Sequence, residues 1–109
     1  MREQTRHVID QHIALDVHVG GFCPVMGQGT VDGRRLYFAA QNETWHFAVA
    51  GSPEVDPAGM TSREGGFYSE EVYEGKARSA GWMTVGEAES LIRRCAEGYA
   101  AEQGLPTTR

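Results

Sequence analysis

Histidine is the most chemically versatile residue type in this chain, which contains four histidines. A zinc site needs three or four ligands that converge on one point. His12, Asp16 and His18 fall on one face of a predicted strand, but His12 and His18 would lie about 20 Å apart along it, too far to share an ion. Asp16 and His18 could share one, yet their spacing is common, and the sequence favours solvent-exposed strand histidines. We therefore predict no metal site.

The two cysteines and a pair of glycines offer the other possible chemistry. Cys23 could be a nucleophile if a histidine activated it, but it lies in a Phe-Cys-Pro turn, where a small buried thiol is more common. Cys95 falls on the buried side of a predicted helix, and we expect two free thiols. No helix follows Gly27 and Gly29, so they do not form a phosphate-binding loop. The sequence predicts a protein that is not an enzyme and needs no cofactor.

Acidic residues are concentrated in one segment, residues 54–74. It holds six carboxylates and one arginine, which equals the net charge of −5 of the whole chain. Direct binding of nucleic acid needs Lys and Arg at the phosphates, and this charge argues against it. A basic protein surface, including a groove that normally holds nucleic acid, would be attracted. The alternative is a solvated loop that its charges keep soluble.

Residues 25–50 read as a three-stranded antiparallel meander that would position these side chains. Asp32-Gly33 is a strong two-residue hairpin turn, and Asn42-Glu43 is expected to form the second turn. This register pairs Phe38 with Phe47 and places every large apolar side chain except Tyr37 and Met26 on one face. Tyr37 and His46 lie on the opposite, polar face, which is thinly covered because it also carries Ala39 and Ala48.

Two further elements complete the prediction. Residues 8–19 alternate between apolar and polar and predict one long strand. Thr84 and Glu87 form a capping box before an apolar-periodic run, which predicts a helix over 85–103 that Gly104 ends. The apolar stripe of the helix can cover the apolar face of the sheet. The sequence thus predicts a single α+β domain over 1–109, with an antiparallel sheet of four or five strands and a disordered tail, 105–109.

The segment between the meander and the helix is harder to interpret. Residues 51–66 read as a loop, because they are rich in Gly and Pro and poor in large apolar residues. Residues 66–74 could be a strand or a short helix. No apolar run is long enough for a membrane span, and the first eleven residues lack the apolar region of a secretory signal. We expect a cytoplasmic protein.

The hairpin GTVDGRRLYF…WHFAVAG, the acidic aromatic stretch and GWMTVGEAESLIRRCAEGYA together resemble small uncharacterised proteins of bacterial phages and prophages. The resemblance covers residues 23–99 and rests on overall pattern. Phage proteins of this size often resemble inhibitors of host defence, anti-CRISPR proteins among them. It implies a phage protein that binds a host protein in the bacterial cytoplasm and needs no active site.

We therefore predict a protein-binding inhibitor or regulator that blocks a basic surface, such as that of a CRISPR-Cas component. A small-molecule binder with an aromatic nucleotide pocket and a phage structural protein are the alternatives. A homodimer through the polar sheet face is also possible. The predicted partner-binding residues are acidic or aromatic and come from the acidic segment and the polar face: Glu64, Phe67, Tyr68, Glu70, Glu71, Tyr73, Glu74, Tyr37 and His46.

Overall fold

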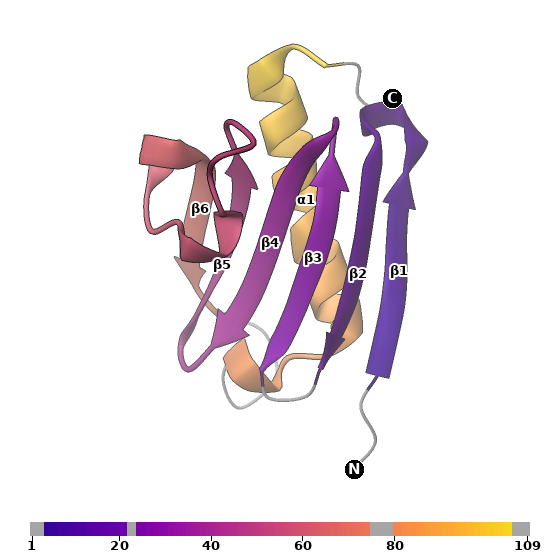
Figure 1. The fold of residues 1–109 in the computed structure, drawn as a ribbon. Coiled ribbons are helices and arrows are strands. Elements are labelled where there is room, and N and C mark those ends of the chain that lie inside the picture. Colours follow the sequence, from indigo (N-terminus) through magenta and orange to yellow (C-terminus); the bar gives the residue numbers. More distant parts are fainter. Residues whose placement is uncertain (1–3, 22–23, 75–79, 106–109) are drawn as a thin grey trace.

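The computed structural model describes residues 4–21, 24–74 and 80–105 and shows an α+β fold. Six antiparallel strands follow one another in chain order across a single sheet, and one C-terminal helix lies against it (Figure 1). The strands are β1 (Gln4–Asp10), β2 (Leu15–Gly21), β3 (Val25–Val31), β4 (Arg34–Gln41), β5 (Thr44–Ala50) and β6 (Gly66–Val72), and the helix is α1 (Val85–Gln103).

The predicted meander is confirmed residue by residue. Asp32, Gly33 and Asn42 have positive φ, as the two tight turns require. The ladder pairs Phe38 with both Gly27 and Phe47. Gly29 lets β3 approach β2 closely, because a Cβ at this position would lie 2.0 Å from the carbonyl oxygen of Asp16.

The helix is also confirmed. The Thr84 hydroxyl accepts from the Glu87 amide while the Glu87 carboxylate accepts from the Thr84 amide, and Gly104 ends the helix in the left-handed region. The apolar stripe of α1 packs on one face of the sheet, and its Ile92 and Ala96 are completely buried there. We call this the inner face, and the face turned away from α1 the outer face. Among the described residues, no helix is long and apolar enough to cross a membrane.

The predicted single strand over 8–19 is wrong. It is two strands, β1 and β2, joined by a 3-10 turn over Gln11–Ile13 and by Ala14, whose φ is +53°. The turn shifts the alternation by one residue, so Val8 is buried while Ile9 is 46% exposed. The sheet therefore has six strands instead of four or five, because residues 66–72 add another.

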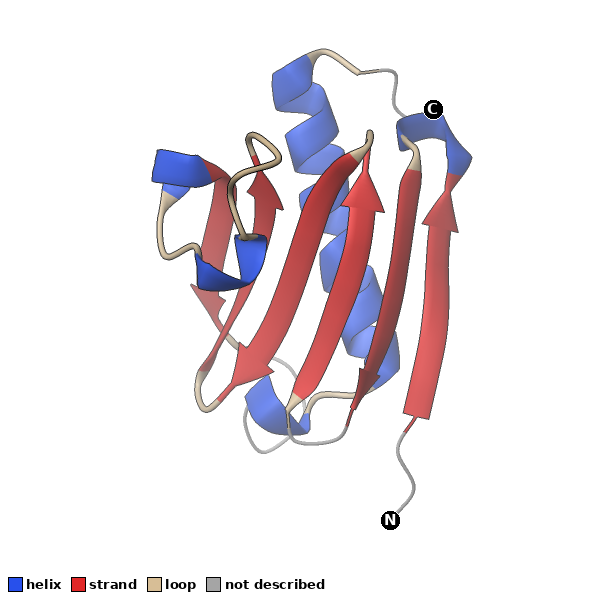
Figure 2. Cartoon of the chain, in the orientation of Figure 1, coloured by secondary structure: helices blue, strands red, loops and turns tan. Residues whose placement is uncertain are grey.

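The segment between β5 and β6 covers part of the outer face, as Figure 2 shows. Its 3-10 turn Pro57–Gly59 contacts β4 and β5. Arg35 donates from the outer face to the carbonyl oxygens of Pro53 and Val55. The prediction of a loop holds, but this loop packs on the sheet.

The structure also bears on three other predictions from the sequence, which concern the flat alanine surface, the disordered tail and the free cysteines. Ala48 is completely buried and Ala39 is 7% exposed, so the flat alanine surface proposed for a homodimer is not open. Leu105 packs against the core, contrary to a tail that is disordered from this residue, and 106–109 lie outside the described residues. Cys95 is buried and free, as predicted, and Cys23 lies outside the described residues.

Candidate functional site

Strand β6 sorts the predicted contact residues onto two faces of the sheet. It pairs antiparallel with β5, so residues 66–72 form a strand and not a helix. Tyr68 and Glu70 pair with outer-face positions of β5, whereas Phe67 and Glu71 pair with inner-face positions. The sequence prediction grouped these residues by their nearness in the chain, and the pleat of the strand separates them.

An aromatic row crosses the outer face on three neighbouring strands. The His46 ring lies between the rings of Tyr37 and Tyr68, with centroid distances of 5.8 and 5.9 Å. The Tyr37 hydroxyl donates to Met26 Sδ at 3.3 Å, and the Tyr68 hydroxyl donates to Glu70 Oε1 at 2.7 Å. We call Tyr37, His46 and Tyr68 the aromatic row. The structure thus brings together four of the predicted contact residues: the three residues of the aromatic row, and Glu70 with its carboxylate.

Burial shifts the ionisation of this row. Loss of hydration lowers the pKa of His46, and the nearby Glu70 carboxylate opposes that shift. Loss of hydration and the hydrogen bond to Glu70 raise the pKa of Tyr68 to about 12. Both shifts favour the uncharged forms of His46 and Tyr68 at neutral pH.

The surroundings of His46 predict the direction in which its pKa should change in a Glu70→Gln variant. The wild-type His46 should titrate below 6.5, and the variant should titrate lower still, because the carboxylate that favours imidazolium is gone. The unfolded chain would then take up a proton before the folded chain does, so His46 should cost stability as pH falls through about 6.5. NMR titration of the histidine ring protons measures both values.

Glu54→Gln provides the control, because Glu54 is an exposed carboxylate in the loop between β5 and β6. It should leave the pKa of His46 unchanged. A wild-type His46 pKa above 6.5, or a rise in Glu70→Gln, would contradict this account of the row.

Phe67 lies on the inner side of β6, where its ring packs against other side chains of the protein. Its ring makes edge-to-face contacts with Phe47 and Tyr99, at centroid distances of 6.0 and 5.6 Å. The guanidinium carbon of Arg63 lies 4.5 Å from the centre of the same ring. Arg63 is in turn paired with Glu102. Phe67 therefore anchors β6 to the end of α1 more than it offers a contact surface.

Three other predicted contact residues, Glu71, Tyr73 and Glu74, line a hollow between β6 and α1. It has a volume of about 270 Å³, and its lining also includes Trp45. The Tyr73 hydroxyl donates to both oxygens of the Glu87 carboxylate at 2.9 Å. This hydrogen bond links the end of β6 to the first turn of α1.

Acidic side chains cluster at one end of β6. Glu70, Glu71 and Glu74 are exposed, and we call these three residues the acidic edge. Glu71 pairs with Arg94 at 3.2 Å, but both side chains are more than half exposed, so the pair adds little stability. Glu64 is also exposed but precedes β6 and lies at the opposite end of the strand. Three of the four predicted carboxylates therefore lie at the same end of β6, with Glu70 on its outer side and Glu71 on its inner side.

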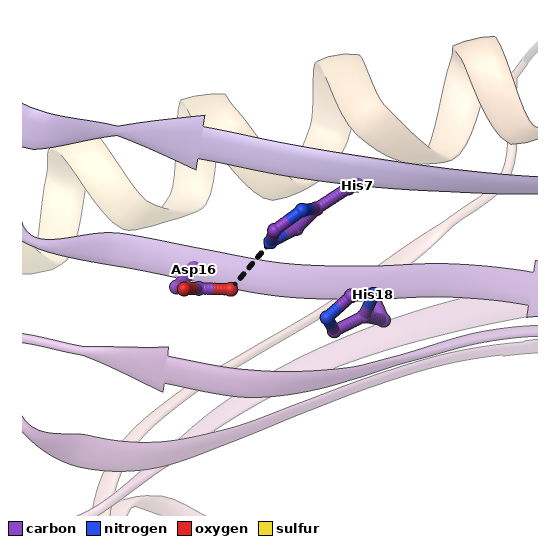
Figure 3. Close-up of side chains that lie close together, drawn as sticks. All are labelled: His7, Asp16 and His18. Carbon is purple, nitrogen blue, oxygen red and sulfur yellow. Dashed lines mark hydrogen bonds and ion pairs between the residues drawn. The ribbon is translucent and has the colours of Figure 1, made fainter.

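Sequence reasoning missed a group of three side chains on the outer face. His7 on β1 and Asp16 and His18 on β2 lie together, as Figure 3 shows. His7 Nε2 and Asp16 Oδ1 are 2.6 Å apart, and the two imidazole rings stack with centroids 4.1 Å apart. His7 was overlooked because the predicted single strand hid the turn that folds it back onto His18. His12, in that turn, is not a member of the group.

Comparison of the chain with protein-family models, with curated proteins and with solved structures found no match in any of the three. The function of these surfaces has to be inferred from their own geometry.

Proposed function

We propose that this protein is a non-enzymatic inhibitor or regulator that binds a basic surface of another protein. The observation that carries the proposal is the contact between the acidic edge and the aromatic row through Glu70 and Tyr68. Charge and aromatic area are adjacent there, on a strand at the edge of the sheet. Such a surface can attract a basic partner and also give it something to pack against.

The charges supply the attraction. Carboxylates on one side of an interface raise the association rate with a basic partner and disfavour acidic ones. The acidic edge lies within a segment that carries a net charge equal to that of the whole chain. A groove that normally holds nucleic acid has the required basic surface. In keeping with the resemblance to phage proteins, a host-defence protein such as a CRISPR-Cas component is the partner class that we propose.

The neighbouring side chains supply the contact area. Aromatic residues and Met are enriched in protein interfaces. Met26 is 40% exposed beside Tyr37, and Val72 on β6 is 63% exposed. Apolar exposure at a sheet edge is usually protected by charge against unwanted strand pairing, and the acidic edge could serve only that purpose. The experiments below separate protection from recognition.

A second candidate is a small-molecule binder that uses the hollow between β6 and α1. The hollow has an aromatic wall, and the guanidinium carbon of Arg94 lies 5.6 Å from the Trp45 ring centre. However, its volume of about 270 Å³ is below the usual range for ligand pockets, about 300–1,000 Å³. Glu71, Glu74 and Glu87 would also repel a phosphate. The lining suits an inserted Lys or Arg side chain better than a nucleotide.

Affinity capture from a bacterial lysate tests the proposal with three baits. The wild type and an Ile9→Ala variant should capture the same protein in equal amounts, because Ile9 is exposed at the opposite edge of the sheet. A Tyr37→Ala/Tyr68→Ala variant should lose it, while its circular dichroism spectrum stays unchanged. Retention of the partner by the double variant would contradict the assigned surface. Release of a small molecule on heating, with no protein captured, would favour the second candidate.

A further inference from the structure

A second, independent site lies on the outer face, at the opposite side of the sheet from β6. His7 and His18 are directly paired across β1 and β2, and Asp16 lies two residues from His18 on the same face. One imidazole nitrogen from each histidine and one carboxylate oxygen lie within 4.8 Å of one another. All three side chains are exposed, and Figure 3 shows them gathered on the two strands.

We propose that His7, Asp16 and His18 bind a divalent transition-metal ion of the zinc class. Two imidazoles and one carboxylate are a donor set typical of zinc with an open coordination position. Imidazole nitrogen suits zinc, cobalt, nickel and copper, whereas magnesium and calcium prefer oxygen donors. The site therefore selects the transition metals by chemistry, and its exposure leaves the remaining position accessible to water or another ligand.

The geometry requires only small movements to close around an ion. Donor atoms at about 2.0–2.2 Å from a tetrahedral zinc lie about 3.3 Å from one another. The widest separation in the group is no more than 4.8 Å, and His7 and Asp16 are already within 2.6 Å. Side-chain rotation can make up the difference because all three side chains lie at the exposed surface.

The backbone that carries the ligands is held firmly. Val8 and Val17 alternate with the ligands and are completely buried on the inner face, which fixes the direction of each ligand side chain. On the next strand, β3, Gln28 pairs with His18 and Thr30 pairs with Asp16. Gln28 and Thr30 are therefore placed where they could hydrogen-bond to the metal-binding side chains of His18 and Asp16 and orient them.

An ordinary surface ion pair is the competing explanation for the contact between His7 and Asp16. Such pairs are common and contribute little. That explanation accounts for His7 and Asp16 but gives no role to His18, whose ring stacks on His7 with an interplanar angle of 13°. A metal would use both rings, so the two explanations differ in what they predict for His18.

Titration of the untagged 109-residue chain with zinc chloride by isothermal calorimetry tests the site. One ion should bind per chain, and both His7→Ala and His18→Ala should weaken binding by about tenfold or more, since even outer-shell changes can cost that much. His12→Ala is the matched control, because His12 is an exposed histidine outside the group, and it should bind as the wild type does. Magnesium chloride should give no binding.

Cobalt provides a second readout that does not depend on the variants. Tetrahedral coordination of Co²⁺ by the wild type should give visible absorption bands, and excess zinc should abolish them. Absence of saturable zinc binding by the wild type would overturn the proposal, as would equal affinity in the His12→Ala and His18→Ala variants. Neither result would bear on the β6 surface, which lies across the sheet.

Discussion

Replacing Phe47 with alanine should lower the free energy of unfolding by about 3–5 kcal/mol, a large share of the stability of a small domain. Phe47 is completely buried, pairs with Phe38 across the sheet and contacts the Phe67 ring edge-on. Its loss would leave a cavity beneath α1, in the same buried cluster as Ile92. Urea denaturation followed by circular dichroism measures the change.

Tyr37→Ala is the matched control for this prediction. Tyr37 lies on the outer face of β4, next to Phe38 in the chain, and is only partly buried. The variant should therefore lose much less stability than Phe47→Ala. Equal losses at the two positions would contradict the division of the sheet into one fully buried face and one partly covered face.

The sequence predicts the centre of the sheet well because its turns carry strong local signals. Asp32-Gly33 and Asn42 provide residues that tolerate positive φ, and the flanking strands place every large apolar side chain except Met26 and Tyr37 on one face. With both turns fixed, a shift of one residue would move those apolar side chains to the opposite face. The helix is equally readable, because the capping box at Thr84 and Gly104 mark its two ends.

The N-terminal hairpin could not be predicted because its turn lacks such a signal. Ala14 adopts the left-handed conformation that Gly, Asn or Asp usually fills. Ile13 in the turn is buried, so the apolar alternation continues through a segment that is not a strand. The only local hint is Asp10, whose carboxylate accepts from the His12 amide. Missing this turn also hid the approach of His7 to Asp16 and His18.

The covering of the outer face depends on contacts that no local pattern encodes. The loop between β5 and β6 is held by Arg35, which donates to two of its carbonyl oxygens, and by burial of Pro57 and Met60. The sequence alone identified the residues of the aromatic row and the acidic edge as candidate contact residues. It did not find that β6 divides Phe67 and Glu71 from Tyr68 and Glu70, because the strand itself was uncertain.

Neutralising the acidic edge should slow partner association markedly. A Glu70→Gln/Glu71→Gln/Glu74→Gln variant keeps side-chain size and polarity while it removes three negative charges. Electrostatic steering changes association rates by a factor of about 10 or more, so we expect a loss on the order of tenfold at low salt. Thermal stability should change little, because the ion pair that the variant loses in the described part of the chain, Glu71 with Arg94, is exposed.

A control variant should remove the same charge elsewhere. Asp32→Asn/Glu54→Gln/Glu97→Gln also removes three negative charges, all from exposed positions outside β6. Asparagine retains the tolerance of positive φ that position 32 requires. If net charge alone governs association, both triple variants should slow it equally, whereas local recognition predicts a larger effect at the acidic edge.

Surface-plasmon-resonance kinetics of these three proteins on the captured partner is the most direct test of the proposed function. The measurements should be made at ionic strengths of about 0.01 and 0.15 M, where screening lengths are about 30 and 8 Å. The wild type should associate faster at low salt, and the acidic-edge variant should lose most of that advantage while the control keeps it. If the acidic-edge variant keeps its affinity and binding by the wild type does not depend on salt, the acidic segment, residues 54–74, only keeps the chain soluble.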